Sequence, residues 1–255
     1  MMSHTIFITG GASGIGFGLA ENLAKDGHHV VLADINEQAV NEAAQRLIDQ
    51  QLNASAVAVD VTDADAVAAL PKRLDTLKID ILINNAGIQH VSRLEDFPAK
   101  KWQQLIDIML VAPALLSQAF LPGMRERNFG RIINVGSIHS LVASPYKSAY
   151  VSAKHGLLGF AKTLALEVAD ADITINTLCP AYVKTPLVEK QIADQAKENG
   201  ISEDEVINEI MLKPMPKKAF ISIEELAGTA RFLISDVARN ITAQTMVLDG
   251  GWTAR

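Results

Sequence analysis

The chain has 255 residues, of which 49% are hydrophobic and 20% charged, and its formal net charge is −6 at pH 7. This negative balance argues against nucleic acid as a partner, and we expect no membrane anchor because no apolar run reaches the roughly 18 residues that a membrane span needs. No secretory signal or metal-ligand spacing is evident, and a single cysteine, Cys179, excludes an internal disulfide framework, so we expect a cytoplasmic protein in a reducing compartment.

The first element in the chain is an apolar run, 5–9, typical of a short buried strand. A glycine-rich stretch follows it and leads into 17–24, where apolar residues recur at helical spacing. Glycines let a backbone approach its ligand closely, and the free N–H groups of a helix N-terminus favour anions. The spacing Thr-Gly-x-x-x-Gly-x-Gly therefore predicts a diphosphate-binding turn, with a purely structural turn as the alternative; its residues are Gly10, Ser13, Gly14, Ile15 and Gly16.

The second predicted strand, 29–33, ends in Asp34. A carboxylate at that place can accept hydrogen bonds from both hydroxyls of an adenosine ribose, and it repels a 2′-phosphate. No arginine or lysine follows directly, so the sequence favours NAD over NADP. The alternative is that Asp34 caps the next helix.

Two further strands end in residues that suit the same ligand. The run 55–59 leads into Asp60 and Val61, which we expect near the adenine. The run 79–83 leads into Asn84 and then Asn85, Ala86 and Gly87, small or amide-bearing residues that suit a wall against the cofactor.

A candidate catalytic group follows the next apolar run, 131–136. Ser137 stands at the predicted strand tip, where its hydroxyl can hold a substrate oxygen. Tyr150 and Lys154 are four residues apart and share one face of a helix. An ammonium beside a phenol favours the phenolate, which makes the tyrosine a usable acid/base near neutral pH. An ordinary exposed i,i+4 pair is the alternative.

Four polar residues from separate loops could surround a small anion. They are Gln89, His139, Lys147 and Gln191. In a parallel sheet these loops converge at the carboxyl edge, where ligands bind. One cation with three neutral hydrogen-bonding groups suits a monocarboxylate, although each side chain alone could be a solvated loop residue.

The alternation of strand-like and helical runs predicts a fold of the α/β class with one domain, 1–255. We expect a Rossmann-like, doubly wound arrangement, in which helices flank a seven-stranded parallel sheet whose last strand is 245–248. The segment 186–218 contains two short helical patterns separated by Gly200, and it reads as a helical lid over the substrate.

The motifs 9–16, 84–87 and 180–185, together with Ser137, Tyr150 and Lys154, occur in an order and spacing that resemble the short-chain dehydrogenase/reductase family over the whole chain. This resemblance implies that Tyr150 is the catalytic acid/base, that Ser137 orients the substrate oxygen, and that Lys154 holds the nicotinamide ribose and lowers the pKa of the tyrosine. It further implies that Pro180, Val183 and Thr185 meet the nicotinamide end of NAD.

The runs 84–90, 137–150 and 185–192 are similar to those of the 3-hydroxybutyrate dehydrogenases within that family. The resemblance implies oxidation of (R)-3-hydroxybutyrate to acetoacetate, with Gln89, His139, Lys147 and Gln191 around the carboxylate. It also implies a homotetramer formed through two long helices and the C-terminal region. The apolar stretch 112–116 suits either that interface or the core of the subunit.

Two residues depart from the family pattern. Met109 stands where many members carry an asparagine that supports a water chain to the lysine, and Ala181 stands where a glycine is usual. Tyr182 and Trp252 are weaker candidates for packing near the pocket. Another enzyme of the family, such as a 3-oxoacyl thioester reductase or a polyol dehydrogenase, remains an alternative, as does a non-catalytic NAD-binding redox sensor.

Overall fold

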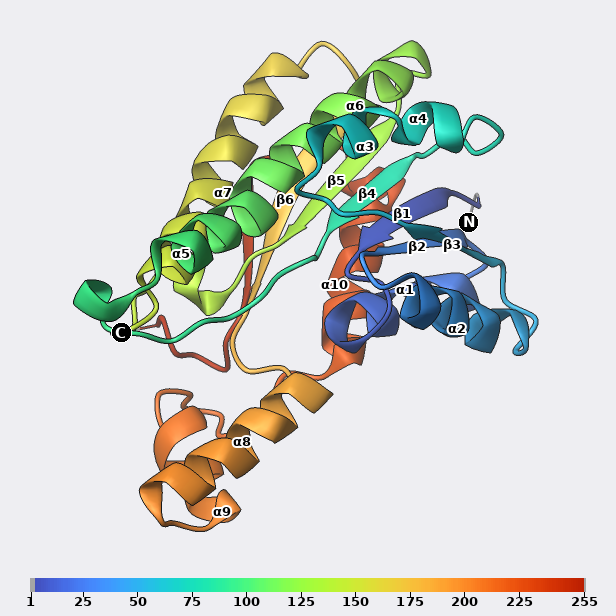
Figure 1. Ribbon diagram of the computed structural model, residues 1–255. Coiled ribbons are helices and arrows are strands. Elements are labelled where there is room, and N and C mark those ends of the chain that lie inside the picture. The colour runs from blue at the N-terminus through green and yellow to red at the C-terminus, as the bar shows by residue number, and fades with distance from the viewer. Residues whose placement is uncertain (1–2, 255) are drawn as a thin grey trace.

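A parallel sheet of seven strands forms the centre of the protein, in the order β3-β2-β1-β4-β5-β6-β7 (Figure 1). The computed structural model describes residues 3–254. The strands are β1 (Thr5–Thr9), β2 (His29–Asp34), β3 (Ala54–Ala58), β4 (Ile81–Asn84), β5 (Gly130–Val135), β6 (Ile173–Pro180) and β7 (Thr245–Leu248). The predicted Rossmann-like fold with seven parallel strands is thereby confirmed.

Helices cover both faces of this sheet (Figure 1). One face carries α1 (Gly14–Lys25), α2 (Glu37–Ile48) and α10 (Ile223–Ile234). The other carries α3 (Ala64–Ala68), α4 (Leu70–Arg73), α6 (Ala112–Glu126) and α7 (Ser148–Glu167). Helix α5 (Ala99–Ile106) runs into α6 through a π-helical turn, η2 (Asp107–Val111).

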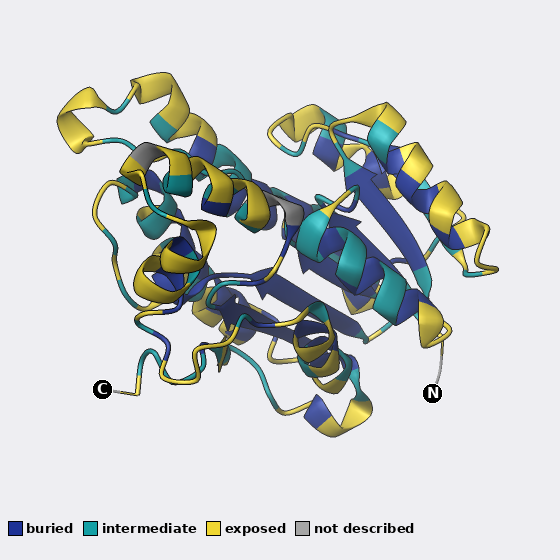
Figure 2. Cartoon of the chain, turned by 90° about the horizontal axis from the view of Figure 1, so that it is seen from below, coloured by how far each residue is buried: buried dark blue, intermediate teal, exposed yellow. Residues whose placement is uncertain are grey.

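Both faces of the strands are apolar because both are covered by helices. Ile6 and Ile8 pack in a cluster with Leu19 of α1, whereas Phe7 packs on the opposite face with Leu116 of α6. Figure 2 shows the result, with buried strands between helices whose outer faces are exposed. The strands therefore read as continuous apolar runs, which is why the sequence identified them.

A buried polar row crosses the sheet near its carboxyl edge. Asn84 of β4 lies opposite Asn134 of β5, which lies opposite Thr177 of β6. The Nδ2 atom of Asn84 donates a hydrogen bond of 2.9 Å to Oδ1 of Asn134. Because an amide buried among apolar groups needs such a partner, the pair fixes how β4 and β5 align.

The strand order reverses at β1, which pairs with β2 on one side and with β4 on the other. Loops that leave neighbouring strands in opposite directions open a crevice at the carboxyl edge, and ligands of doubly wound folds bind there. The glycine-rich turn follows β1 directly, and so it opens onto this crevice.

The helical stretch Ala99–Glu126 is long and apolar enough to cross a membrane, judged by length and composition alone. In the folded chain it contributes Leu105, Met109 and Phe120 to two apolar clusters, so it is a core helix of the domain. Ala112 and Leu116 are also buried inside the subunit. The stretch 112–116 therefore contributes to the core of the subunit, one of the two roles expected for it.

The segment 186–218 projects beyond the carboxyl edge of the sheet (Figure 1). It holds α8 (Pro186–Asn199), α9 (Glu203–Glu205) and a π-helical turn, η4 (Val206–Met211). Gly200 ends α8 with a φ of 65°, a left-handed conformation that glycine adopts without strain. Ile192, Val206 and Met211 form a small apolar cluster of their own, so the segment has internal packing.

Candidate active site

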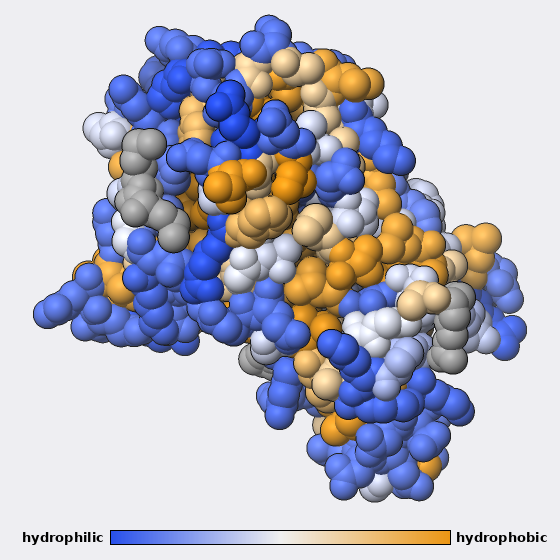
Figure 3. All heavy atoms as spheres, turned by 180° about the vertical axis from the view of Figure 1, so that it is seen from behind, coloured by the Kyte–Doolittle hydropathy of each residue, from blue (hydrophilic) through white to orange (hydrophobic). Residues whose placement is uncertain are grey.

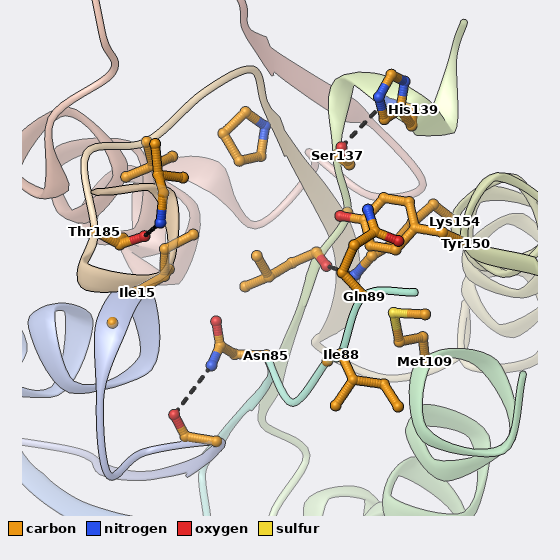
Figure 4. A pocket seen from close by; sticks show the side chains of 18 of the residues that line it. Ile15, Asn85, Ile88, Gln89, Met109, Ser137, His139, Tyr150, Lys154 and Thr185 are labelled. Atoms are coloured by element: carbon orange, nitrogen blue, oxygen red, sulfur yellow. Dashed lines mark hydrogen bonds between the residues drawn. The ribbon is translucent and has the colours of Figure 1, made fainter. Parts of the chain in front are cut away.

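A cavity of about 360 Å³ lies at the carboxyl edge of the sheet, between the loops after β1, β4, β5 and β6. Most of the side chains singled out in the sequence line it, as Figure 4 shows for several of them. They are Gly10, Ser13, Gly14, Ile15, Asp34, Asn85, Ala86, Gly87, Gln89, Ser137, His139, Lys147, Tyr150, Lys154, Pro180, Val183, Thr185 and Gln191. The fold thus joins residues that are up to 181 positions apart, from Gly10 to Gln191.

The glycine-rich turn has a geometry that larger residues would prevent. Gly10 has a φ of 62°, in the left-handed region that favours glycine. Gly16 does not line the cavity, but a Cβ atom there would collide with the carbonyl oxygen of Gly10. Helix α1 begins at Gly14 without an acidic residue in its first turn. These features fit a backbone cradle for a diphosphate.

Asp34 lies at the end of β2, against the glycine-rich turn. Its Oδ2 atom accepts a hydrogen bond of 3.3 Å from the N–H of Ala12, and Oδ1 accepts one of 3.2 Å from Asn36. The cap of α2 is Asn36, whose side chain accepts from Ala39 at 3.0 Å. The interpretation of Asp34 as that cap is therefore wrong. With the cradle, this carboxylate fits the ribose end of a dinucleotide.

The loop after β4 is fastened to the glycine-rich turn (Figure 4). Nδ2 of Asn85 donates to the carbonyl oxygen of Thr9 at 2.9 Å. The hydroxyl of Thr9 accepts from the N–H groups of Asn85 and Ala86, both at 3.0 Å. The two walls of the cavity are consequently held at a fixed separation.

Two residues expected near the adenine, Asp60 and Val61, do not line this cavity. The Oδ1 atom of Asp60 accepts a hydrogen bond from the hydroxyl of Thr62 at 2.7 Å. Asp60 lines a neighbouring hollow of about 300 Å³ together with Ile35. Val61 packs at the edge of the core instead. Strand β3 stops at Ala58, and the turn after it places Asp60 at this hollow, which residues of α5 and Ile35, the neighbour of Asp34 in the chain, also line.

Ser137, Tyr150 and Lys154 meet at the inner end of the cavity (Figure 4). Ser137, 9% exposed, begins a short turn, η3 (Ile138–Ser140), and its hydroxyl accepts from the N–H of His139 at 3.1 Å. Lys154 is 5% exposed, and Nζ donates to the carbonyl oxygen of Val135 at 2.6 Å. That ammonium lies 5.7 Å from the centroid of the Tyr150 ring.

The titration of these groups follows from their burial. Burial lowers the pKa of Lys154 to about 8. Burial also raises the pKa of Tyr150, which a hydrogen bond from Ser137 only partly opposes. The net direction is opposite to the expected lowering by Lys154, because burial of the phenol has the largest effect on its pKa.

The outer end of the cavity carries a lysine and a histidine in contact. Nζ of Lys147 lies 3.5 Å from Nε2 of His139, and the hydroxyl of Ser144 lies 3.4 Å from the same nitrogen. Burial and the nearby Lys147 charge lower the pKa of His139 to about 4, so the imidazole is neutral at neutral pH. Its Nδ1 atom is buried without a hydrogen-bond partner. This arrangement presents one positive charge and uncharged polar groups.

A family model described as short chain dehydrogenase matches residues 4–196, about three quarters of the chain. The chain belongs to this family. The protein is therefore a short-chain dehydrogenase, an oxidoreductase, and members of its family generally use NAD(P).

Curated relatives cover the whole dehydrogenase. It is 45% identical to the D-beta-hydroxybutyrate dehydrogenase of Rhizobium meliloti over 100% of both chains, and 39% identical to that of Cupriavidus necator over 98% of both. It is 42% identical to the uncharacterized oxidoreductase YxjF of Bacillus subtilis, again over 100% of both chains. A solved structure of a candidate gluconate dehydrogenase from Agrobacterium tumefaciens superimposes with a TM-score of 0.89 at 29% identity, covering 98% of this chain and 95% of that one.

The cavity of this short-chain dehydrogenase also includes apolar residues that the sequence did not single out as binding residues. Ile88, Val135, Ile138 and Val188 are among them. Ile88 and Ile138 directly follow or precede predicted site residues in the chain, and Val135 ends β5, so closeness to a strand tip could have found these three. Val188 lies within α8, one helical turn from Thr185 and from Gln191. These four residues make part of the cavity wall apolar.

The two departures from the family pattern both face this cavity. Met109 lies in the π-helical turn η2 and is 1% exposed. Its Sδ atom packs against Gly87, where a Cβ atom added to the glycine would lie 3.5 Å from the sulfur. A thioether donates no hydrogen bond, so Met109 contributes an apolar wall. Ala181 does not have a positive φ, so the backbone there tolerates its side chain.

Tyr182 and Trp252, the weaker candidates, form one aromatic unit with His139. The rings of Tyr182 and Trp252 stack with centroids 6.2 Å apart, and Trp252 meets the His139 ring edge-on at 6.1 Å. Tyr182 lines the cavity, and Trp252 supports both neighbours.

Proposed function

We propose that this short-chain dehydrogenase is an NAD-dependent enzyme that oxidises (R)-3-hydroxybutyrate to acetoacetate. The observation that carries the proposal is the contact between Lys147 and His139 in the cavity that also holds Tyr150. Gln89 and Gln191 line the same cavity. A single cation with amides suits a monocarboxylate, and two relatives named D-beta-hydroxybutyrate dehydrogenase support this substrate.

The residues present fit a nicotinamide dinucleotide. In this proposal the diphosphate lies along Gly10 and residues 13–16, and Asp34 binds the adenosine ribose. The adenine extends from there toward the neighbouring hollow, near Asp60 and Val61. Residues 85–87, Lys154, Pro180, Val183 and Thr185 hold the nicotinamide end. When bound, the dinucleotide supplies the acceptor for the hydride. A carboxylate at position 34 favours NAD because it repels a 2′-phosphate.

The chain's own groups then perform the binding and the proton transfer. Lys147, with the amides of Gln89 and Gln191 and the imidazole of His139, holds the carboxylate. Ser137 donates a hydrogen bond to the substrate oxygen. Tyr150, as the tyrosinate, removes the hydroxyl proton as the C–H bond at C3 breaks, and as the phenol it returns that proton in the reverse reaction. Lys154 supplies a positive charge that favours the tyrosinate.

We also propose that the chain is a single domain in which 186–218 acts as a lid over the substrate. Gln191 on α8 lines the cavity, and Thr185, at the base of α8, caps that helix by accepting from Val188 at 3.4 Å. Closure of such a segment would exclude water from the hydride path. A cytoplasmic homotetramer is the expected form of the enzyme.

The test is NADH formation from (R)-3-hydroxybutyrate, from its (S) form and from sorbitol, each with NAD⁺ and with NADP⁺. Turnover with the (R) acid and NAD⁺ alone is expected. Silence with all three substrates would contradict the proposed substrate and favour a thioester reductase or a non-catalytic sensor.

A further inference from the structure

The turn before α7 holds a tyrosine in a backbone conformation that tyrosine rarely adopts. Tyr146 has a φ of 66° and directly follows Pro145. A proline followed by a residue with positive φ has the arrangement of a type II turn, and glycine or asparagine is the usual choice at the second of these positions. Because the Tyr146 side chain is 50% exposed, burial does not account for a bulky residue there.

Contacts with a second loop explain why the turn nonetheless holds. The carbonyl oxygen of Tyr146 accepts a hydrogen bond of 2.9 Å from the N–H of Ser92. The guanidinium carbon of Arg93 lies 6.0 Å from the centroid of the Tyr146 ring, within the range of a cation–π interaction. We call Ser92, Arg93 and Tyr146 the clasp. It joins the loop after β4 to the turn that leads into α7.

Each of the two joined loops carries a residue of the outer cavity. Gln89 precedes Ser92 by three positions, and Lys147 immediately follows Tyr146. The carbonyl oxygen of Lys147 accepts from the N–H of Val151 at 2.9 Å, so this residue is fixed to the start of α7. The direction of its side chain toward His139 therefore depends on how the turn enters the helix.

We propose that the clasp positions Lys147 and Gln89 for the substrate carboxylate, with Tyr146 as a positioning residue that sets the affinity for the acid. This rests on the proposed function, since it assigns the outer cavity to a carboxylate. A loop that is ordered beforehand binds more tightly because binding no longer has to immobilise it. A glycine at position 146 would suit the backbone better but would lack the ring that Arg93 covers.

The decisive variant is Tyr146→Gly. It relieves the backbone strain of the turn but removes the ring that holds Lys147 and Gln89 in position. Its Tm is expected not to fall, since glycine accepts a positive φ. Its KM for (R)-3-hydroxybutyrate is expected to rise about three- to tenfold, the scale of losing a cation–π contact and some order in the loop. Its kcat and its Kd for NADH are expected to stay at the wild-type values.

Gln51→Gly is the matched control. Gln51 has a φ of 63°, is exposed, and lies between α2 and β3, away from the cavity. This substitution relieves the same kind of strain and should leave KM unchanged. Arg93→Ala should raise KM as Tyr146→Gly does, whereas Tyr146→Phe, which keeps the ring face, should preserve the wild-type KM.

The outcomes separate the clasp from the proposed function. If Lys147→Ala raises KM but Tyr146→Gly and Arg93→Ala do not, the clasp is overturned and the carboxylate site stands. If Tyr146→Gly lowers Tm, kcat and NADH affinity together, its role is structural and the clasp is again overturned. A wild-type enzyme that turns over no 3-hydroxy acid overturns the proposed function, and the role of the clasp with it.

Discussion

Replacing Lys147 by alanine tests the proposed carboxylate site most directly. The side chain is half-buried, and His139 beside it contributes no charge because burial holds the pKa of that imidazole at about 4. Lys147 is therefore the group that meets the carboxylate with a positive charge. Two unit charges about 4 Å apart attract by about 4 kcal/mol at an effective dielectric of about 20, and desolvation offsets part of that. A charged hydrogen bond is worth roughly 1.5–3 kcal/mol in net terms.

That range predicts a fall in kcat/KM of about ten- to a hundredfold for (R)-3-hydroxybutyrate in Lys147→Ala, measured by steady-state NADH formation at fixed saturating NAD⁺. Lys190→Ala is the matched control, because Lys190 is exposed on α8. The substitution removes the same charge next to Gln191, away from the contact with His139. The control should retain the wild-type kcat/KM. An unchanged kcat/KM in Lys147→Ala, or an equal loss in both variants, would refute the reasoning.

Three further predictions follow from the same site. Tyr150→Phe should lose nearly all turnover while it binds NADH with wild-type affinity in a fluorescence titration, and substantial turnover would contradict the acid/base role. Asp34→Asn keeps an oxygen for the N–H of Ala12 but loses the charge, so kcat/KM with NADP⁺ should rise about tenfold, the effect of removing roughly 1.4 kcal/mol of repulsion. His139 has a pKa of about 4 in the folded chain against 6.5 for the free group, so the unfolded chain binds the proton first. Its contribution to stability is present above pH 6.5 and lost as the pH falls toward 4, by roughly 3 kcal/mol in total. The free energy of unfolding, measured with denaturant as a function of pH, should show this extra loss in wild type but not in His139→Asn. Parallel pH dependences in the two proteins would contradict this titration of His139.

The sequence predicted the sheet well because the strands are buried on both faces. Thr5–Thr9 and Thr245–Leu248 begin and end where the apolar runs predicted. The run 79–83 was less accurate, since pairing in β4 begins at Ile81. Burial makes Ile79 apolar whether or not it pairs with a neighbouring strand, and so composition alone did not place that boundary.

Site residues could be predicted where they closely follow the end of a strand, because the strand then determines their position. Residues within two positions of a strand tip, such as Asn85 and Ser137, reached the cavity because the tip places them there. Asp60 did not, because the turn after β3 directs its carboxylate to the hydroxyl of Thr62. The direction of the pKa shift of Tyr150 also escaped prediction, since spacing on a helix shows which groups are near one another but not how deeply the phenol is buried.

Surface properties were the least predictable part. Figure 3 shows a largely hydrophilic face crossed by an apolar band, and the sequence alone did not indicate such a band. The φ of 66° at Tyr146 is a similar case, because a tyrosine after a proline does not by itself signal a left-handed turn.

The hydrogen bond between Asn84 and Asn134 has a consequence for how the enzyme can fail. Side chains alternate between the two faces of a strand, so β4 and β5 can shift against each other only in steps of two residues, about 6.6 Å. Asn85 and Ser137 follow these strands closely, and such a step would carry them wholly out of place. The catalytic centre is therefore either fully assembled or not assembled at all. Partial denaturation should reduce the number of active molecules in a population, while each molecule that remains folded keeps its full rate.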